Sequence, residues 1–459
     1  MREGGSKSMA ITRRQFVTRL GTLAAAMGLS QVDAAKISEV FAHAPAGTLF
    51  WYQKPRVVWV HGAECTGCST SLLSLFEDVQ GEAIYGSGVS TLAALDLAVG
   101  GNGDGTQVVT NGLDAGHPFG HRTVVNSAPV TGSDFDTDAN ATRGAYIANI
   151  ADVLVDFISL EYHETVNGMG GDLAYQWLLD QMTAGDDPTK AFVLVVEGAT
   201  QDKTEAGAWS DTAGNGFPWC SIGMDGADGA SAEHSFDDVV TTLAGRGDCI
   251  GVVAIGQCAT FGGYPGCVSP KFTASQTPAR GTYDHLDHAA GAKDKVINVP
   301  GCPTNPWWFT LSVVAFLVDY FNGPGAPVPA DGPLGILDSA GNIKSTAVDG
   351  NRRLKAVYGV PLHGPACTRY QDFLNGVYAT RPGERGCLQL IGCKGPSTNS
   401  LCTVHGWNGQ QPENDTSWDY GIATVQGAKG GNCVAGGAPC MGCTEPGYPD
   451  RFVPFVVRR

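Results

Sequence analysis

The cysteines of this chain constrain its fold more than any other feature. Fourteen are present in 459 residues, and most stand beside glycine or proline. Thiolates are the usual ligands of iron–sulfur clusters, and glycine turns let a backbone close around a bulky group. Eleven of the cysteines have spacings that suit such clusters: Cys65, Cys68, Cys258, Cys302, Cys367, Cys387, Cys393, Cys402, Cys433, Cys440 and Cys443. The sequence therefore predicts a protein that conducts electrons.

Composition narrows the class further. The formal net charge is -16, whereas a nucleic-acid-binding surface needs a basic face for the phosphates. The length leaves room for two domains and a sizeable core. Sixty-three glycines and only 16% charged residues suit a loop-rich fold wrapped around cofactors.

The N-terminus, residues 1–45, is predicted to be a twin-arginine signal peptide. Thr12-Arg13-Arg14-Gln15-Phe16-Val17 carries the arginine pair, and a mild apolar stretch follows at 20–29. A disordered basic segment is the alternative. Because twin-arginine export moves proteins that have already folded and received cofactors, the fourteen cysteines favour clusters over the disulfides common in secreted chains. The predicted location is the periplasm or the extracytoplasmic face of the membrane.

A second apolar run covers residues 307–321 and includes Asp319. A helix that spans a membrane needs roughly 20 apolar residues, so this run predicts a buried helix of a folded domain. The expected protein has no transmembrane anchor of its own.

Four β-branched runs between residues 55 and 325 predict buried strands. They lie at 57–60, 192–196, 252–255 and 296–299. Continuous apolar runs of this length are typical of a parallel sheet covered on both faces. The residues after Cys68, from Ser69 to Ser71, can cap a helix with Leu72 facing inward. The predicted fold class is α/β, with a flavodoxin-like, doubly wound sheet.

Three of the predicted strands lead into a cysteine motif. Cys65 and Cys68 follow the first, Cys258 follows the third, and Cys302 follows the fourth. Ligands of open parallel sheets bind beyond the carboxyl ends of the strands. The four thiols are therefore expected to meet at one edge of the sheet and to share one cofactor.

Two other regions have a different character. Residues 84–145 are rich in glycine and aspartate and predict a surface insertion. After residue 340 the strand patterns fade, and glycine, proline and cysteine dominate. The expected domains are 46–340 for the sheet and 341–459 for an irregular, loop-rich domain that clusters would cross-link.

At these residues the chain resembles the small subunit of [NiFe] hydrogenases. The resemblance covers nearly everything after residue 55 apart from the insertion. Its markers come in the family's order: Glu64-Cys65-Thr-Gly-Cys68, Ile158-Ser-Leu-Glu-Tyr-His-Glu-Thr165, Val196-Glu-Gly198, Gly256-Gln-Cys258-Ala-Thr-Phe-Gly-Gly263, Pro300-Gly-Cys-Pro303, Gly392-Cys393-Lys-Gly-Pro396, Trp407-Asn408 and Cys440-Met-Gly-Cys443-Thr-Glu-Pro446.

The resemblance implies three clusters in a line. The proximal [4Fe–4S] cluster would be bound by Cys65, Cys68, Cys258 and Cys302. The distal [4Fe–4S] cluster would take His363, Cys367, Cys387 and Cys393, although three residues separate the histidine from its first cysteine where the family has two. A surface histidine is the alternative for His363.

The medial cluster would take Cys402, Cys433, Cys440 and Cys443. Most relatives have a proline at the position of Cys433 and a [3Fe–4S] cluster, so the thiol here predicts [4Fe–4S], with [3Fe–4S] or a free thiol as the alternative. Cys220, Cys249 and Cys267 have no assigned role and are expected to be small buried side chains.

The implied function is electron transfer between the Ni–Fe centre of a partner large subunit and an external carrier, in the reaction H₂ ⇌ 2H⁺ + 2e⁻. The external carrier would be a membrane cytochrome or another electron-transfer subunit. Glu64 and Glu164 are candidates for a proton relay, with surface or capping carboxylates as the alternative. Two other classes stay open: a stand-alone ferredoxin-like carrier and a zinc-stabilised structural module.

Overall fold

The computed structural model describes ten parts of the chain: 56–73, 158–202, 220–224, 233–266, 277–288, 291–320, 336–365, 367–402, 407 and 432–449. The predicted signal peptide, the insertion at 84–145, Cys267 and Asn408 lie outside these residues.

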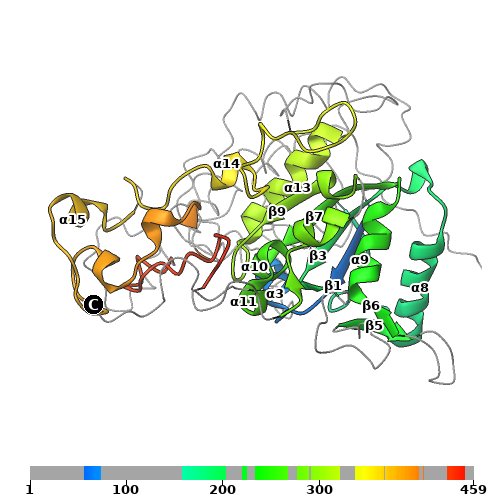
Figure 1. The fold of residues 1–459 in the computed structure, drawn as a ribbon, viewed down its shortest axis with the longest axis horizontal. Coiled ribbons are helices and arrows are strands. Elements are labelled where there is room, and N and C mark those ends of the chain that lie inside the picture. The colour runs from blue at the N-terminus through cyan, green and yellow to red at the C-terminus, as the bar shows by residue number, and fades with distance from the viewer. Residues whose placement is uncertain are drawn as a thin grey trace, which may run out of the picture.

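A five-stranded parallel sheet forms the centre of the molecule (Figure 1). Its strands are β1 (Arg56–His61), β2 (Ser159–His163), β3 (Phe192–Glu197), β7 (Cys249–Ile255) and β9 (Val296–Val299). Their order across the sheet is β2-β1-β3-β7-β9, and every neighbouring pair is parallel. In chain order this is 2-1-3-4-5, the flavodoxin-like arrangement, which confirms the predicted fold class.

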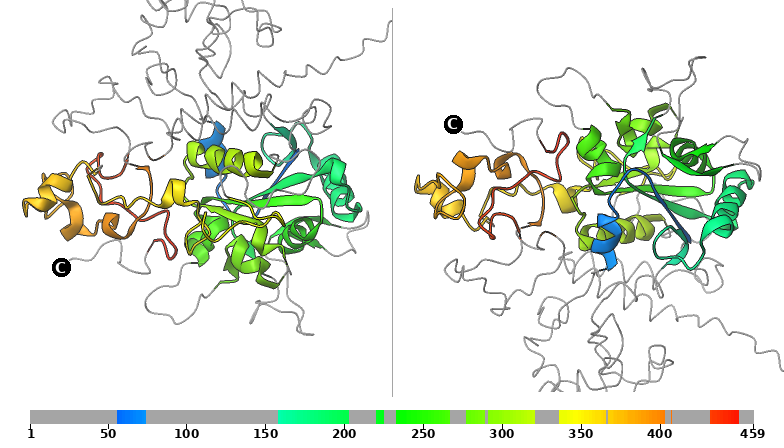
Figure 2. Two further views of the ribbon diagram at one scale, coloured as in Figure 1. Left: turned by 90° about the horizontal axis from the view of Figure 1, so that it is seen from above. Right: turned by 90° about the horizontal axis from the view of Figure 1, so that it is seen from below.

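Helices cover both faces of the sheet (Figure 2). Alternate strand residues point to opposite faces. Val57, Val193 and Val253 pack in one cluster with the long helix α13 (Pro306–Tyr320). Their neighbours along the strands pack in a second cluster with α8 (Gly171–Thr183) and α9 (Phe236–Gly245). Burial on both faces explains why the strand sequences are apolar without a break.

The remaining elements are short. Two-stranded antiparallel ladders join β4 (Thr200–Gln201) to β8 (Ala279–Arg280) and β5 (Ser221–Met224) to β6 (Glu233–Ser235). The short α-helices are α3 (Gly67–Leu73), α10 (Gly256–Phe261), α11 (Gly263–Gly266), α12 (Thr282–His285), α14 (Lys355–Tyr358) and α15 (Tyr370–Leu374). Turns of 3₁₀ helix lie at Pro188–Lys190, Leu286–His288, Lys293–Lys295, Leu388–Ile391 and Gly395–Ser397.

The helix after the first strand begins earlier than predicted. It starts at Gly67, so Ser69 lies inside α3 and does not cap it. The Ser69 hydroxyl instead donates a hydrogen bond to Glu197, at the end of a neighbouring strand. The predicted cap was wrong because the Ser69 hydroxyl bonds to Glu197 in the tertiary structure and not to the helix main chain. Leu72 is buried, as predicted.

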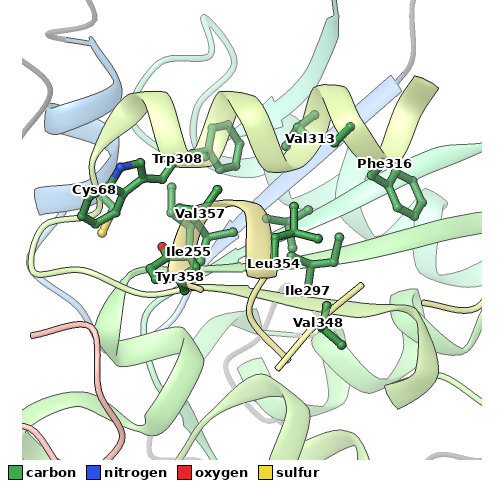
Figure 3. Close-up of a cluster of buried hydrophobic side chains, with 14 of the residues drawn as sticks. Cys68, Ile255, Ile297, Trp308, Val313, Phe316, Val348, Leu354, Val357 and Tyr358 are labelled. Atoms are coloured by element: carbon green, nitrogen blue, oxygen red, sulfur yellow. The ribbon is translucent and has the colours of Figure 1, made fainter. Parts of the chain in front are cut away.

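Helix α13 is the buried helix expected from the second apolar run. Trp308 and Phe316 are almost inaccessible, and the carboxylate of Asp319 accepts hydrogen bonds from the main chain of Ile336 and Leu337. Figure 3 shows α13 packed over α14 and the sheet, with Cys68 at one end of the same cluster. No helix among the described residues has both the length and the apolar character needed to cross a bilayer.

Beyond residue 336 the described chain has isolated bridges and short helices but no named strand. Leu354, Val357 and Tyr358 pack on the sheet's core, and the Tyr358 hydroxyl donates to the Pro300 carbonyl at 2.8 Å. Farther along, the chain extends away from the sheet toward α15 (Figure 1). This part holds seven of the cysteines singled out by the sequence.

Candidate metal centres

Four thiols meet at the carboxyl edge of the sheet, as the sequence predicts. Cys65 and Cys68 follow β1, Cys258 lies in α10 directly after β7, and Cys302 follows β9. Burial and, after it, the charges of Cys302 and Cys65 raise the pKa of Cys258 to about 12, which places these three groups within electrostatic range. The pKa of Cys68 is also raised by burial, and Cys258 adds to that shift.

Three glycines leave space for these sulfurs. A Cβ atom at Gly256 would lie 2.5 Å from Cys68 Sγ, and one at Gly263 would lie 2.6 Å from Cys258 Sγ. At Gly67 the corresponding distance to Cys65 Sγ is 3.0 Å. Gly256 and Gly263 also have positive φ angles of 86° and 63°, which a side chain disfavours. The glycines beside the cysteines therefore shape the space around the thiols.

A second group lies far from the sheet, around the loop before α15. Cys387 and Cys393 are close enough to Cys367 that their charges contribute to its raised pKa, after burial. A Cβ atom at Gly395 would lie 3.5 Å from Cys393 Sγ and 3.8 Å from His363 Cβ, so the histidine borders the same group.

The imidazole of His363 is held edge-on by aromatic rings. Its centroid lies 4.5 Å from that of Phe373 and 5.4 Å from that of Tyr370. Burial lowers the pKa of His363, and its Nε2 atom is buried without a hydrogen-bond partner among the described residues. A neutral imidazole with an unsatisfied nitrogen suits a metal ligand.

A third group of cysteines contacts both of the first two groups. Cys402, Cys440 and Cys433 each contribute, after burial, to the raised pKa of Cys443. Cys433 also raises the pKa of Cys402, which burial brings to about 12. The four cysteines predicted for the medial position thus come together in the fold.

Hydrogen bonds connect the three groups directly. The Cys440 main-chain N–H donates to Cys393 Sγ at 3.3 Å. At the other side, a main-chain hydrogen bond from Cys302 reaches the sulfur of Cys443. One loop, residues 440–443, therefore contacts both the strand-end group and the group near α15.

The donor sets fit iron–sulfur clusters. Burial disfavours a free thiolate at most of these cysteines, so they would bind as thiolates only beside a cation that supplies the compensating charge. In the described part of the chain, the one trio of ligand atoms that lie within 4.8 Å of one another is formed by His61, Glu64 and Glu197. The thiols are spaced more widely than a single tetrahedral ion requires, which favours a bulky cluster over zinc.

Glu197 organises the strand-end group, and the sequence analysis assigned it no role. Its side chain is about 1% exposed at the end of β3. One carboxylate oxygen accepts from the main-chain N–H groups of Cys68 (3.0 Å) and Ser69 (3.1 Å). The other accepts from Ser69 Oγ (2.5 Å) and Trp59 Nε1 (3.2 Å). The sequence carried one indication of this role, because Glu197 directly follows the predicted buried strand at 192–196.

A second buried histidine continues this network. His163 Nδ1 accepts from the main-chain N–H groups of Thr165 and Val166, so its Nε2 carries the proton and donates to Ser69 Oγ at 3.1 Å. This tautomer is neutral, and burial together with the charge of His61 lowers the pKa of His163 to about 3. The Ser69 hydroxyl is thereby directed at Glu197.

The two predicted relay carboxylates both contact His61. Glu64 Oε1 accepts from His61 Nδ1 at 3.2 Å, and Glu164 Oε1 accepts from the His61 main chain at 3.2 Å. Burial acts to lower the pKa of His61, but the Glu64 hydrogen bond and the charges of Glu197 and Glu164 outweigh it and raise that pKa. Glu64 is mostly buried, whereas Glu164 is exposed.

Two of the three unassigned cysteines lie within the described residues, where they are small packed side chains. Cys249 is buried within β7, and Cys220 is partly buried against the same core cluster. Burial raises the pKa of both thiols to about 11.

Two family models match the chain. One describes the 20 kDa subunit of NADH ubiquinone oxidoreductase and matches residues 144–316. The other describes the C-terminal part of NiFe/NiFeSe hydrogenase small subunits and matches residues 358–421.

Three relatives align over almost the whole chain. The periplasmic [NiFeSe] hydrogenase small subunit of Desulfomicrobium baculatum is 26% identical over 98% of this chain and 99% of that protein. The periplasmic [NiFe] hydrogenase small subunit 1 of Nitratidesulfovibrio vulgaris is 25% identical over 99% and 96%. The hydrogenase-2 small chain of Escherichia coli is 26% identical over 96% and 78%.

Solved structures agree on the fold. A chain of the [NiFeSe] hydrogenase of Dm. baculatum superposes with a TM-score of 0.51 at 24% identity, covering 87% of this chain and 96% of that one. A NiFe hydrogenase chain from Ralstonia eutropha also gives 0.51, at 21% identity, covering 90% and 84%.

Proposed function

Because the chain belongs to the family of [NiFe] hydrogenase small subunits, we propose that it relays electrons between a Ni–Fe centre in a large subunit and an external redox partner. The observation that carries this proposal is the pair of hydrogen bonds that joins three thiol groups in series, from Cys302 to Cys443 and from Cys440 to Cys393. Through-bond and hydrogen-bonded contacts of this kind provide a continuous route from the sheet edge to the region of α15.

The clusters, when bound, supply reversible one-electron transfer. We assign the proximal site to Cys65, Cys68, Cys258 and Cys302, and the distal site to His363, Cys367, Cys387 and Cys393. The protein's own part is to fix the ligands: Glu197 holds the main chain at Cys68, and the aromatic pair Tyr370 and Phe373 holds the His363 ring.

The medial site is assigned to Cys402, Cys433, Cys440 and Cys443 and to a [4Fe–4S] cluster. The proximity of Cys433 to Cys402 and Cys443 supports a fourth ligand. The turn that carries it is tight, since the Cys433 carbonyl accepts from the Ala438 main chain at 2.8 Å. A Cys433→Pro variant should replace this cluster with a [3Fe–4S] form, detectable by electron paramagnetic resonance. A stoichiometric three-iron signal in the unmodified protein would contradict the assignment.

Glu64 and Glu164 are proposed to carry protons beside the proximal site. Although much of Glu164 is exposed, its carboxylate packs against the His61 main chain, and the partial loss of hydration there raises its pKa. The charges of Glu64 and Glu197 act in the same direction, and His61 opposes the shift. A carboxyl with a raised pKa holds a proton closer to neutral pH, as a relay requires. His61 lies between the two carboxylates and contacts both.

Export through the twin-arginine pathway, to the periplasm or the extracytoplasmic face, is proposed from the motif at Arg13 and Arg14. The two Desulfomicrobium and Nitratidesulfovibrio relatives are named as periplasmic, which supports it. Lysine at both arginines should leave this chain and its large subunit in the cytoplasm, as fractionation would show.

The central experiment is anaerobic purification of the tagged chain from its native host. The expected result is co-purification of a nickel-containing large subunit, broad visible absorption and hydrogen-dependent reduction of a dye. A coloured protein without a nickel-containing partner would instead indicate a stand-alone carrier, and a colourless zinc protein would indicate a structural module.

A further inference from the structure

Two buried side chains hold the segment that directly follows Cys443. Arg353 Nη1 donates to the Thr444 carbonyl at 2.7 Å and lies 2.9 Å from the Glu445 carboxylate. Gln257 Nε2 donates to the Glu445 carbonyl at 3.0 Å. Each of the two donor residues is only 2% exposed. Two distant parts of the chain therefore bind the same short segment, and the proposed ligand sets give neither donor a role.

Arg353 is itself fixed on the side of the sheet. Its Nε and Nη2 atoms lie 2.8 and 2.7 Å from Asp349 Oδ2, and its guanidinium lies over the ring of Tyr358, 5.4 Å from the centroid. The Tyr358 hydroxyl in turn donates to the carbonyl of Pro300, two residues before Cys302. A guanidinium bound through several of its donors has a defined orientation. Arg353 therefore joins the segment after the medial cysteines to the loop that carries a proximal ligand.

Gln257 makes a second connection to the proximal site. It directly precedes Cys258 in α10, and its main-chain N–H donates to the Gly301 carbonyl at 2.8 Å. Gly301 is the residue before Cys302. Because the side chain of the same glutamine binds Glu445, one residue contacts two proximal loops and the segment after the medial cysteines.

Glu445 connects that segment to the other part of the medial site. Its Oε1 atom accepts from the Asn399 main-chain N–H at 2.6 Å, three residues before Cys402, and the same oxygen contacts Arg353. The side chain is 6% exposed, so the hydrogen bond and the ion pair compensate its buried charge. Arg353, Gln257 and Glu445 thus form one junction, which contacts the ligand-bearing segments of both sites.

We propose that Arg353 and Gln257 are positioning residues: by holding the segment after Cys443, they fix the medial site relative to the proximal site and set the rate of electron transfer between them. The inference rests on the proposed function, because it presumes that the cysteines of both sites bind clusters. Each transfer moves one electron from one site to the other and breaks no covalent bond, and neither residue gains or loses a proton. A misplacement of about 1 Å can slow a position-dependent reaction by roughly two orders of magnitude.

The test compares Arg353→Lys with Arg352→Lys in the anaerobically purified heterodimer. Lysine keeps the positive charge beside Asp349, but it lacks the planar fork that binds several acceptors at once. Arg352 is the matched control, because this neighbouring guanidinium donates to the carbonyls of Val296 and Asp294, in and just before β9.

The magnetic interaction between the reduced proximal and medial sites, measured by electron paramagnetic resonance, reports their separation. Rapid freezing after mixing with hydrogen gives the rate of electron transfer between them. Arg353→Lys should weaken the interaction and slow the transfer by about tenfold or more, with unchanged iron content. Arg352→Lys should leave the interaction, the rate and the iron content unchanged.

Gln257→Met is the second variant. Methionine keeps the length of the side chain and removes the donor to Glu445, and no charge is left unpaired. This variant should weaken the same interaction to a smaller extent than Arg353→Lys does. It also keeps the test decisive if Arg353→Lys does not assemble.

An unchanged magnetic interaction in both Arg353→Lys and Gln257→Met would overturn the inference, and so would an equal change in Arg352→Lys. Loss of the medial cluster in Arg353→Lys, together with a normal interaction in Gln257→Met, would also overturn it, because the arginine would then serve stability alone. Failure of the proposed function is a different result, namely the absence of iron–sulfur signals in the unmodified protein.

Discussion

The strand-end thiols and the thiols beyond residue 336 are held by different physical means. At the sheet edge, each cysteine follows a strand or lies at the start of a helix, and the strands are buried on both faces. In the C-terminal region, the cysteines lie outside the named helices and strands, and the sulfurs of Cys393 and Cys440 accept hydrogen bonds from the main-chain N–H groups of Cys440 and Gly442. The first group inherits its geometry from the sheet, whereas the second depends on its own local contacts.

This difference indicates where cofactor binding and folding are coupled. Hydrophobic burial can maintain the sheet without a metal, because its core clusters run through all five strands. Residues 336–362 share that core through Leu354 and Val357. The part from His363 onward adds six buried side chains to it, and three of these are the candidate ligands Cys367, Cys402 and Cys440. Bound metal would therefore supply much of its stability, as in small metal-dependent domains.

The effect expected to reach the largest part of the chain comes from removing iron. Anaerobic chelation of the purified heterodimer should speed amide hydrogen exchange in residues 363–402 and 432–449 by at least about tenfold, equivalent to a loss of about 1.4 kcal/mol of local stability. The amides of strands β3 and β7 should keep their slow exchange. Exchange measured by mass spectrometry before and after chelation tests this. An equal rise in the C-terminal segments and in the strands would show that the two regions depend on metal to the same extent.

A second effect is local to the sheet edge. Glu197→Ala leaves the donors of Trp59, Cys68 and Ser69 buried without an acceptor, which should cost roughly 2–5 kcal/mol of unfolding free energy. The proximal cluster signal should fall while the medial and distal signals persist. Denaturant unfolding and paramagnetic resonance measure the two effects.

Glu161→Ala is the matched control for that variant. Glu161 is a carboxylate on β2 that lies 3.4 Å from Arg56 and accepts from Ser159, in a partly exposed position. Its loss should cost at most about 1 kcal/mol. Equal destabilisation by both variants would show that Glu197 has no special role in placing Cys68.

A third effect separates backbone strain from crowding of a sulfur. Gly263 and Gly291 both have positive φ, so alanine at either should cost roughly 1 kcal/mol. A Cβ atom at Gly263 would meet Cys258 Sγ at 2.6 Å, whereas none of the described neighbours lies within 4 Å of one at Gly291. Only Gly263→Ala should also lower the iron content. Equal iron content in the two variants, measured per heterodimer, would be incompatible with the crowding argument.

The smallest effect is the pH dependence from His163. In the unfolded chain this histidine binds a proton below its ordinary pKa near 6.5, while the folded chain stays neutral down to about 3. The unfolded state therefore binds more protons, and folding stability falls as pH falls through 6.5. Between pH 7 and pH 6 the loss from this residue is about 0.7 kcal/mol.

His163→Gln should remove that contribution. The amount by which the unmodified protein is more stable than the variant should therefore shrink as the pH falls from 7 to 6. Comparing the two proteins cancels the opposite dependence expected from His61, whose pKa is raised. Chemical unfolding at both pH values provides the measurement. A difference that grows as the solution is acidified would contradict the neutral assignment of His163.

The sequence alone was enough for the α/β fold and for four of its five sheet strands, because fully buried strands are apolar without interruption. Strand β2 was not predicted, since it lies at the sheet edge and Glu161 interrupts its apolar pattern. The meeting of the four strand-end thiols also followed from the strand pattern, whereas the medial and distal groups came from the family resemblance. Their assignment as cluster ligands remains a prediction.

The hydrogen bonds around those thiols were decided by the tertiary structure. Serine is a residue type that often caps helices, yet the Ser69 hydroxyl donates a hydrogen bond to Glu197. Glu197 lies on a neighbouring strand. The segment around Thr444 is held against the sheet domain by Arg353 and Gln257, whose side chains donate to the carbonyls of Thr444 and Glu445. Residue type and spacing determine which atoms can bind a metal, because those properties are local to a motif. The donors that orient the ligands come from distant parts of the chain, and only the packing of the folded protein brings them together.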